Sequence, residues 1–186
     1  MIFLAAVLAG LAAGWIGGGR LTELAEVRVR AWPAVLAGVL CNVLLPLGWP
    51  GLRDHLWAEL ARACLLYGSV GYLLWANRRL SGAAPAAVGT ACNALATLRY
   101  GGRMPVWVAA AWRQPAARAR LVAGGYVDHA AMWHPHALGW LGDVFTVPPP
   151  LRPDVFSVGD VGIALGLALF LASSMRSRRA SAASGS

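Results

Sequence analysis

The run FSVGDVGIALGLALFLASSM, from Phe156 to Met175, decides the fold class. Asp160 is its only charged residue, and the rest of Val158–Met175 is apolar or small. Four further apolar runs precede it. Each of the five has a length near or somewhat below the roughly 20 residues with which a helix spans a bilayer. The other four lie at residues 2–16, 32–49, 57–75 and 85–98. The sequence therefore predicts an all-α integral membrane protein with about five transmembrane helices.

The composition is too apolar for an ordinary water-soluble domain. Of the 186 residues, 58% are hydrophobic and only 13% are charged, whereas a typical soluble domain has about 25% charged residues. The 16 basic residues are all arginines, they give a net charge of +8, and they flank the apolar runs. This arrangement favours the lipid bilayer over nucleic acid as the partner of the arginines. Cys41, Cys64 and Cys92 lie inside apolar runs, which predicts packing residues and neither a disulfide nor a zinc site.

The arginines also predict an orientation, because positive residues accumulate in the loops that remain in the cytoplasm. They follow the first and third apolar runs and the fifth. This predicts an outer N-terminus, a cytoplasmic C-terminus, one membrane domain over residues 1–176 and a disordered tail over residues 177–186. The arginines assigned to the cytoplasmic side are Arg20, Arg28, Arg30, Arg78, Arg79, Arg176, Arg178 and Arg179.

The second and fourth runs resemble each other and suggest an internal repeat. Both begin near a proline, and both contain a Cys-Asn pair, Cys41-Asn42 and Cys92-Asn93. The first four helices are therefore predicted to be two helical hairpins in parallel repeat, an arrangement that places binding sites between the repeats of many transporters. The two asparagines have two interpretations. They form hydrogen bonds across the helix bundle, or they face a polar cavity and hold a ligand.

Residues 99–157 are predicted to form an outer polar cap, since they are too numerous for a simple connection. The short apolar stretch Val106–Trp112 is expected to lie in the membrane interface. At the end of the cap, Ser157 and Asp160 have the spacing of a capping box, in which each side chain bonds the backbone N–H of the other residue. The rival interpretation is an intramembrane aspartyl protease, which needs a second carboxylate beside Asp160. The other helices offer only Glu59, and the other candidate, Asp143, lies among loop residues before three prolines.

A metal site in the cap is a further alternative. Imidazole and carboxylate ligands suit zinc or copper. However, the spacing of the histidines and acidic residues in the cap is not that of a helical metal motif, and no metal is predicted. The residues considered are Asp128, His129, His134, His136 and Asp143.

Four motifs stand in order along the chain: Gly101-Gly102-Arg103-Met104-Pro105-Val106, His129, Leu141-Gly142-Asp143 and Phe156-Ser157-Val158-Gly159-Asp160-Val161. In these motifs the chain resembles a membrane protein family of unknown function (domain of unknown function 5317). The resemblance extends over most of the chain, although Tyr100 replaces the Asn usual before the Gly-Gly-Arg-Met-Pro string. It implies a multi-pass protein of the bacterial cytoplasmic membrane, without an established activity.

Three functions remain open from the sequence. The first is binding of a small molecule or lipid between the helical hairpins and the cap. The second is a role as an accessory or structural subunit beside another membrane protein. The third is a membrane-embedded hydrolase that uses His129 with Asp143 or Asp160. A non-enzymatic role is favoured, and no particular cofactor is implied. The predicted ligand-binding residues are Arg99, Arg103, His129, Asp143, Asp160, Asn42 and Asn93.

Overall fold

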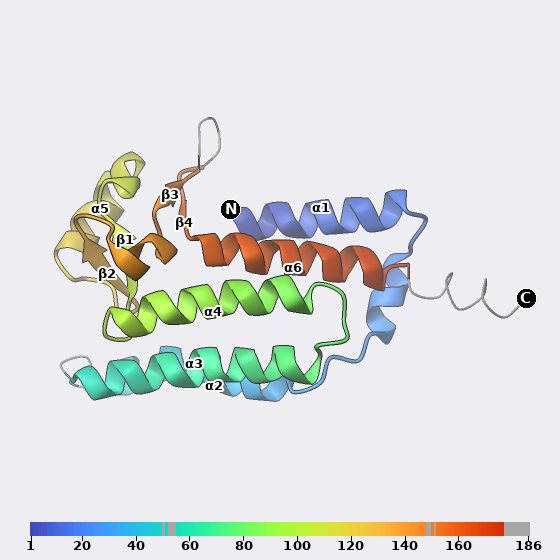
Figure 1. Cartoon of the computed structure of the whole chain (residues 1–186), viewed down its shortest axis with the longest axis horizontal. Coiled ribbons are helices and arrows are strands. Elements are labelled where there is room, and N and C mark those ends of the chain that lie inside the picture. Colours follow the sequence, from blue (N-terminus) through green and yellow to red (C-terminus); the bar gives the residue numbers. More distant parts are fainter. Residues whose placement is uncertain (50, 52–54, 148–149, 151, 177–186) are drawn as a thin grey trace, which may run out of the picture.

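The computed structural model describes residues 1–49, 51, 55–147, 150 and 152–176. Five helices run side by side, and a small mixed cap lies at one end of them (Figure 1). The predicted tail 177–186 lies outside the described residues, as do Arg178 and Arg179. The five helices are α1 (Ile2–Ile16), α2 (Trp32–Gly48), α3 (Leu56–Ala76), α4 (Ala83–Arg99) and α6 (Val158–Ser174).

Each of the five apolar runs is a helix whose ends fall within two residues of the predicted range. Pro33 occupies the first turn of α2, where its missing N–H is not needed for a helical hydrogen bond. Ser157 is the N-cap of α6, and the predicted capping box with Asp160 is present. Among the described residues, no helix has both the length and the hydropathy required to cross a membrane.

Small residues bring α4 and α6 into close contact along their length. A methyl group added at Gly89 would lie 2.3 Å from the Gly159 carbonyl oxygen and 2.7 Å from the Ile163 nitrogen. One added at Gly166 would lie 2.6 Å from the Gly82 carbonyl oxygen. The two backbones therefore pack directly against each other, as small residues allow between helices.

The helices pack differently from two equivalent hairpins. The main contacts of α1 are with α6, whereas α2 packs against α3, and α3 against α4. In Figure 1, α6 and α4 lie between α1 and the α2–α3 pair. The sequence similarity of α2 and α4 is therefore not matched by equivalent packing, because the first helix joins the last one and not its neighbour in sequence.

The turn that follows α3 is fixed to the segment that leads into α2. The buried Asn77 side chain accepts a hydrogen bond from the Arg30 backbone N–H at 2.9 Å and donates to the Arg30 carbonyl at 2.8 Å. It also donates to the Leu73 carbonyl at 2.8 Å. The ends of α2 and α3 that lie away from the cap are thus held together by one amide.

The cap differs from the all-α prediction, because its described residues contain four short strands. Strand β1 (Met104–Trp107) pairs in parallel with β2 (His129–Met132), and β3 (Phe145–Thr146) pairs in antiparallel fashion with β4 (Val155–Phe156). The short helices are η1 (Leu21–Glu26), between α1 and α2, and, within the cap, η3 (Ala110–Arg113), α5 (Pro115–Val122) and η4 (Ala137–Leu141).

The stretch Val106–Trp112 was expected at a membrane interface, but it forms the centre of the cap. Val106 and Val108 are buried and pack with Leu121 of α5. This correction has a simple cause. β1 pairs with β2, so most of its side chains are enclosed between strand and helix, and the exposed residues of the stretch are Ala109 and Trp112.

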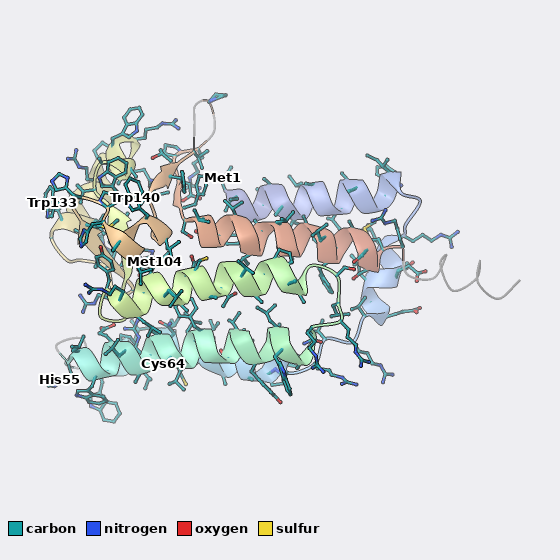
Figure 2. The ribbon with its side chains drawn as sticks, viewed as in Figure 1. Met1, His55, Cys64, Met104, Trp133 and Trp140 are labelled. Carbon is teal, nitrogen blue, oxygen red and sulfur yellow. The ribbon has the colours of Figure 1, made fainter. Side chains whose placement is uncertain are left out.

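The N-terminus and the cap lie at the same end of the helices. The Met1 amino group forms an ion pair with Asp154 of the cap, and Figures 1 and 2 show Met1 beside the cap. The other end carries the turns that contain many arginines. The arginines at that end are Arg20, Arg28, Arg30, Arg78, Arg79 and Arg176.

Candidate ligand-binding cavity

A cavity of about 340 Å³ lies where α2, α3, α4 and the start of α6 meet the cap. We call it the junction cavity. Its lining combines apolar helix residues with a concentration of polar and charged groups from the cap and the helix ends. The lining residues are Val39, Asn42, Val43, Arg62, Ala63, Leu66, Tyr67, Asn93, Thr97, Gly102, Met104, Asp128, His129, Asp143 and Asp160.

The wall formed by α4 and α6 is fixed by a closed set of hydrogen bonds around Asp160. One carboxylate oxygen of Asp160 accepts from the Ser157 backbone N–H at 3.0 Å, and the other accepts from Asn93 Nδ2 at 2.9 Å. Ser157 Oγ donates to Asn93 Oδ1 at 2.8 Å and accepts from the Asp160 N–H at 2.9 Å. The capping box thus also connects α6 to α4, and Asn93 forms the cross-helix bond that was one of its two predicted roles.

The opposite wall contains a buried ion pair on α3. Glu59 and Arg62 are 3% and 4% exposed, and Arg62 Nη1 donates to Glu59 Oε2 at 3.0 Å. Arg62 Nη2 donates to Asn42 Oδ1 of α2 at 3.1 Å. Arg103 of the cap donates to the other oxygen of Glu59 at 3.3 Å. One carboxylate is therefore shared by two arginines.

This pair was not predicted as part of the site, although the sequence carries a signal for it. Glu59 and Arg62 stand three residues apart within an otherwise apolar run, and charges at that spacing meet on one face of a helix. A buried charge is retained only when it is paired or hydrogen-bonded. Two opposite charges inside an apolar helix therefore indicate a polar interior, which was predicted only around Asn42, Asn93 and the cap.

Gly102 fixes the cap against the first turns of α3. Its φ of +89° lies in the left-handed region, and a methyl group there would be 2.4 Å from both the carbonyl carbon and the carbonyl oxygen of Glu59. Its N–H donates to the Thr97 carbonyl at 2.9 Å. Only glycine combines this conformation with so close an approach, and Arg103 and Met104 are placed at the cavity as a result.

His129 lies between two carboxylates at the cap wall of the cavity. Its Nδ1 is 2.7 Å from Asp128 Oδ1, and its Nε2 is 3.7 Å from Asp143 Oδ2. Burial alone would lower the pKa of His129, but the hydrogen bond with Asp128 and the charges of both carboxylates outweigh it and raise that pKa. The same hydrogen bond lowers the pKa of Asp128.

Asp143 is the least satisfied carboxyl of the cavity. It is 6% exposed, and within the described part of the chain its side chain has no hydrogen-bond partner. Burial raises the pKa of Asp143 to about 7, and the nearby His129 offsets this only in part. At neutral pH the carboxyl is therefore divided between its protonated and ionised forms.

Residues 26–172 match a family of unknown function, DUF5317. The chain belongs to the DUF5317 family. No curated protein and no solved structure matches the chain. The DUF5317 match begins after α1 and includes every residue that lines the junction cavity.

In this DUF5317 chain, the junction cavity brings together most of the predicted ligand-binding residues. Five of the seven line it. Arg103 is not a lining residue, but it forms an ion pair with Glu59, which also pairs with the lining residue Arg62. Arg99 does not line the cavity, because it lies exposed at the end of α4. The five lining residues are Asn42, Asn93, His129, Asp143 and Asp160.

The histidines considered for a metal site do not gather at one place in the cap of this DUF5317 chain. His134 and His136 are exposed, and His136 Nδ1 lies 3.0 Å from the His134 carbonyl oxygen. Across the described ranges, no three histidine, cysteine or acidic side chains are grouped as they would be around a metal ion.

Asp143 gives the DUF5317 chain a testable pH dependence. Its pKa in the folded state is about 7, above the value of about 3.9 expected when unfolded. Its contribution to stability is therefore complete below about pH 4 and is lost as the pH rises through about 7, with a slope of at most about 1.4 kcal/mol per pH unit. We expect Asp143→Asn to become progressively more stable than the wild type between pH 5 and pH 8, measured by thermal unfolding in detergent. A constant difference over that range would contradict this assignment.

Proposed function

We propose that this chain is a multi-pass protein of the bacterial cytoplasmic membrane that binds a small molecule or lipid in the junction cavity. The cavity itself is the observation that carries the proposal. Binding sites for small molecules typically have volumes of about 300–1,000 Å³, with apolar walls and a few convergent polar groups. The junction cavity has about 340 Å³ and combines Val39, Val43 and Leu66 with the charged groups of the cap.

The outer surface of the helices supports the membrane part of the proposal. Large apolar side chains project outward along the helices (Figure 2), and an exposed apolar surface of this kind suits contact with lipid. Exposed tryptophans stand at the helix ends, where aromatic anchors meet the headgroups. They are Trp15, Trp32, Trp49, Trp57 and Trp75.

The proposed orientation predicts the outcome of reporter insertions. Alkaline phosphatase requires disulfides, which form outside the cytoplasm. We expect phosphatase inserted between Gly124 and Gly125, both exposed in the cap, to be active. Phosphatase inserted between Arg79 and Leu80 should be inactive, and green fluorescent protein after residue 186 should fluoresce. Equal phosphatase activity at both insertion points would contradict the orientation.

The binding proposal predicts a bound molecule that leaves when the cavity is filled. Leu66 lines the cavity, whereas its neighbour Leu65 is 51% exposed on the outside of α3. Leu66→Trp and Leu65→Trp therefore make the same change inside and outside the site. We expect mass spectrometry of extracts from purified protein to find a near-stoichiometric small molecule or lipid with the wild type and Leu65→Trp, but not with Leu66→Trp.

Two results of that experiment would overturn the binding proposal. One is the absence of a stoichiometric molecule from the wild type. The other is equal retention by both tryptophan variants. The comparison requires that both variants unfold cooperatively, which thermal unfolding in detergent checks.

Hydrolysis is a second candidate, favoured by the position of His129 between two carboxylates at the cavity wall. An imidazole with a carboxylate partner is suited to act as a general base. Ser157 Oγ is engaged with Asn93 and Asp160, so a water molecule would be the nucleophile. Release of cleavage products from the extracted molecule, abolished in His129→Ala, would favour this candidate, whereas recovery of the intact molecule favours binding.

A further inference from the structure

We propose that the junction cavity is specific for a small zwitterion, which places its ammonium group at Asp143 and its oxyanion at Arg62. The inference rests on the binding function proposed above and adds the chemical class of the ligand. It follows from the different polarity of two walls of the cavity.

The first wall, formed by α2 and α3, is short of hydrogen-bond acceptors. A guanidinium has five N–H donors, and those of Arg62 reach Glu59 and Asn42. Its Nε is buried and has no hydrogen-bond partner in the described residues. Glu59 is shared with Arg103, so it balances the charge of Arg62 only in part. An oxyanion beside this guanidinium supplies the acceptor and the negative charge that the wall lacks.

The second wall, formed by the cap and the start of α6, has an excess of carboxylates. Asp128, Asp143 and Asp160 face the cavity together with a single imidazole, that of His129. Asp160 is satisfied by Asn93 and Ser157, and Asp128 pairs with His129. Asp143 is left buried, with His129 Nε2 at 3.7 Å as its nearest charged partner. An ammonium group that donates to Asp143 completes this wall.

Because one wall lacks a negative charge and the other lacks a positive one, the two walls exclude ligands that carry only one kind of charge. An anion without an ammonium group would leave Asp143 unsatisfied and would meet the carboxylates of the cap. A cation without an oxyanion would leave Arg62 without the additional acceptor and negative charge. The ethanolamine headgroup of a phospholipid and a free soluble zwitterion share the required chemistry, and both are tested below.

Three soluble probes separate the contributions of the two charges. Glycerophosphoethanolamine carries both, glycerophosphoglycerol has only the phosphodiester, and ethanolamine has only the ammonium. We expect the first to bind the full-length protein in detergent at least about tenfold more tightly than either of the others, because a charge-assisted hydrogen bond contributes enough to change affinity by that factor. Equal affinity for glycerophosphoglycerol would overturn the proposal.

Asp143→Asn and Asp154→Asn provide a matched pair of variants. Both remove one acidic charge from the cap, but Asp154 does not line the junction cavity. We expect Asp143→Asn to lose about tenfold in affinity for glycerophosphoethanolamine and Asp154→Asn to bind as the wild type does. An equal effect of both variants would overturn the assignment of the ammonium group to Asp143.

Proton release provides a readout that a purely structural role of Asp143 would not change. An ammonium group beside this carboxyl favours its ionised form. Since Asp143 has a pKa of about 7, binding at pH 7 should release about half a proton. Calorimetry in two buffers with different ionisation enthalpies measures this number, which should fall to about zero in Asp143→Asn. Unchanged release in Asp143→Asn would contradict the proposal.

Nanodiscs distinguish the two sources of the zwitterion. If the ligand is a lipid headgroup, phosphatidylethanolamine discs should stabilise the protein against thermal unfolding more than phosphatidylglycerol discs, and Leu66→Trp should abolish the difference. If the ligand is a free zwitterion, the two discs should act alike while glycerophosphoethanolamine still binds. A co-purified molecule that leaves in Leu66→Trp but lacks an ammonium group would overturn the zwitterion and leave the binding function intact.

Discussion

Gly102→Ala is expected to lower the free energy of unfolding by about 2–5 kcal/mol, because two costs add. A left-handed φ costs a residue with a side chain about 1–2 kcal/mol, and a forced contact in a packed interior costs about 1–3 kcal/mol. The φ of Gly102 is +89°, and the new methyl group would lie 2.4 Å from the Glu59 backbone. Backbone atoms of a helix cannot move aside as the end of a flexible side chain can.

Gly124→Ala is the matched control for this substitution. Gly124 also has a positive φ, +69°, but a methyl group there meets nothing within 4 Å. It should therefore lose only the first cost, about 1–2 kcal/mol. Chemical denaturation in detergent measures both variants. Equal losses would show that the contact of Gly102 with α3 does not contribute. Gly102→Ala should also reduce ligand occupancy, because the displaced loop carries Met104, which lines the junction cavity.

Gly89→Ala is expected to have the second large effect, a loss of about 1–3 kcal/mol from overpacking between α4 and α6. The added methyl group would lie 2.3 Å from the Gly159 carbonyl oxygen and 2.7 Å from the Ile163 nitrogen. The two helices must separate to admit it. That movement also strains the hydrogen bonds from Asn93 to Asp160 and from Ser157 to Asn93.

Gly68→Ala provides the contrasting result. Gly68 lies within α3, and a methyl group there meets nothing within 4 Å. Alanine is favoured over glycine inside a helix by about 0.5–1 kcal/mol, so this variant should be as stable as the wild type or more stable. Thermal unfolding of both variants in detergent tests the contrast. A loss in Gly68→Ala as large as that in Gly89→Ala would contradict the close packing of α4 and α6.

The helices and the start of α6 could be predicted because their signals are local. Long apolar runs mark the helices, and the spacing of Ser157 and Asp160 is enough to specify a capping box. The pairing of β1 with β2 could not be predicted, since each strand has only four residues. Runs so short show no reliable alternation, and their register depends on the intervening chain.

The cavity could be predicted only in part, for a related reason. Asn42, Asn93 and the acidic residues of the cap stood out because polar groups are rare in their surroundings. Their assembly depends on which faces of the helices meet, and the sequence does not contain that information in a local form. Glu59 and Arg62 were therefore not predicted to belong to the cavity, although the packing of α2 on α3 encloses them.

The contact between α4 and α6 has a consequence for how a ligand enters. Because glycines line much of their contact, these two helices pack closely and form one block, and α1 packs on the same block. The α2–α3 pair meets it across the junction cavity. Asn77 holds α2 and α3 together at the end away from the cap, and at that end the turn between Ala76 and Ala83 joins the pair to the block. A hinge at that end would leave the cap end as the part that opens. The expected entry movement is thus an outward swing of α2 and α3, which parts the Glu59–Arg103 ion pair and uncovers the cavity.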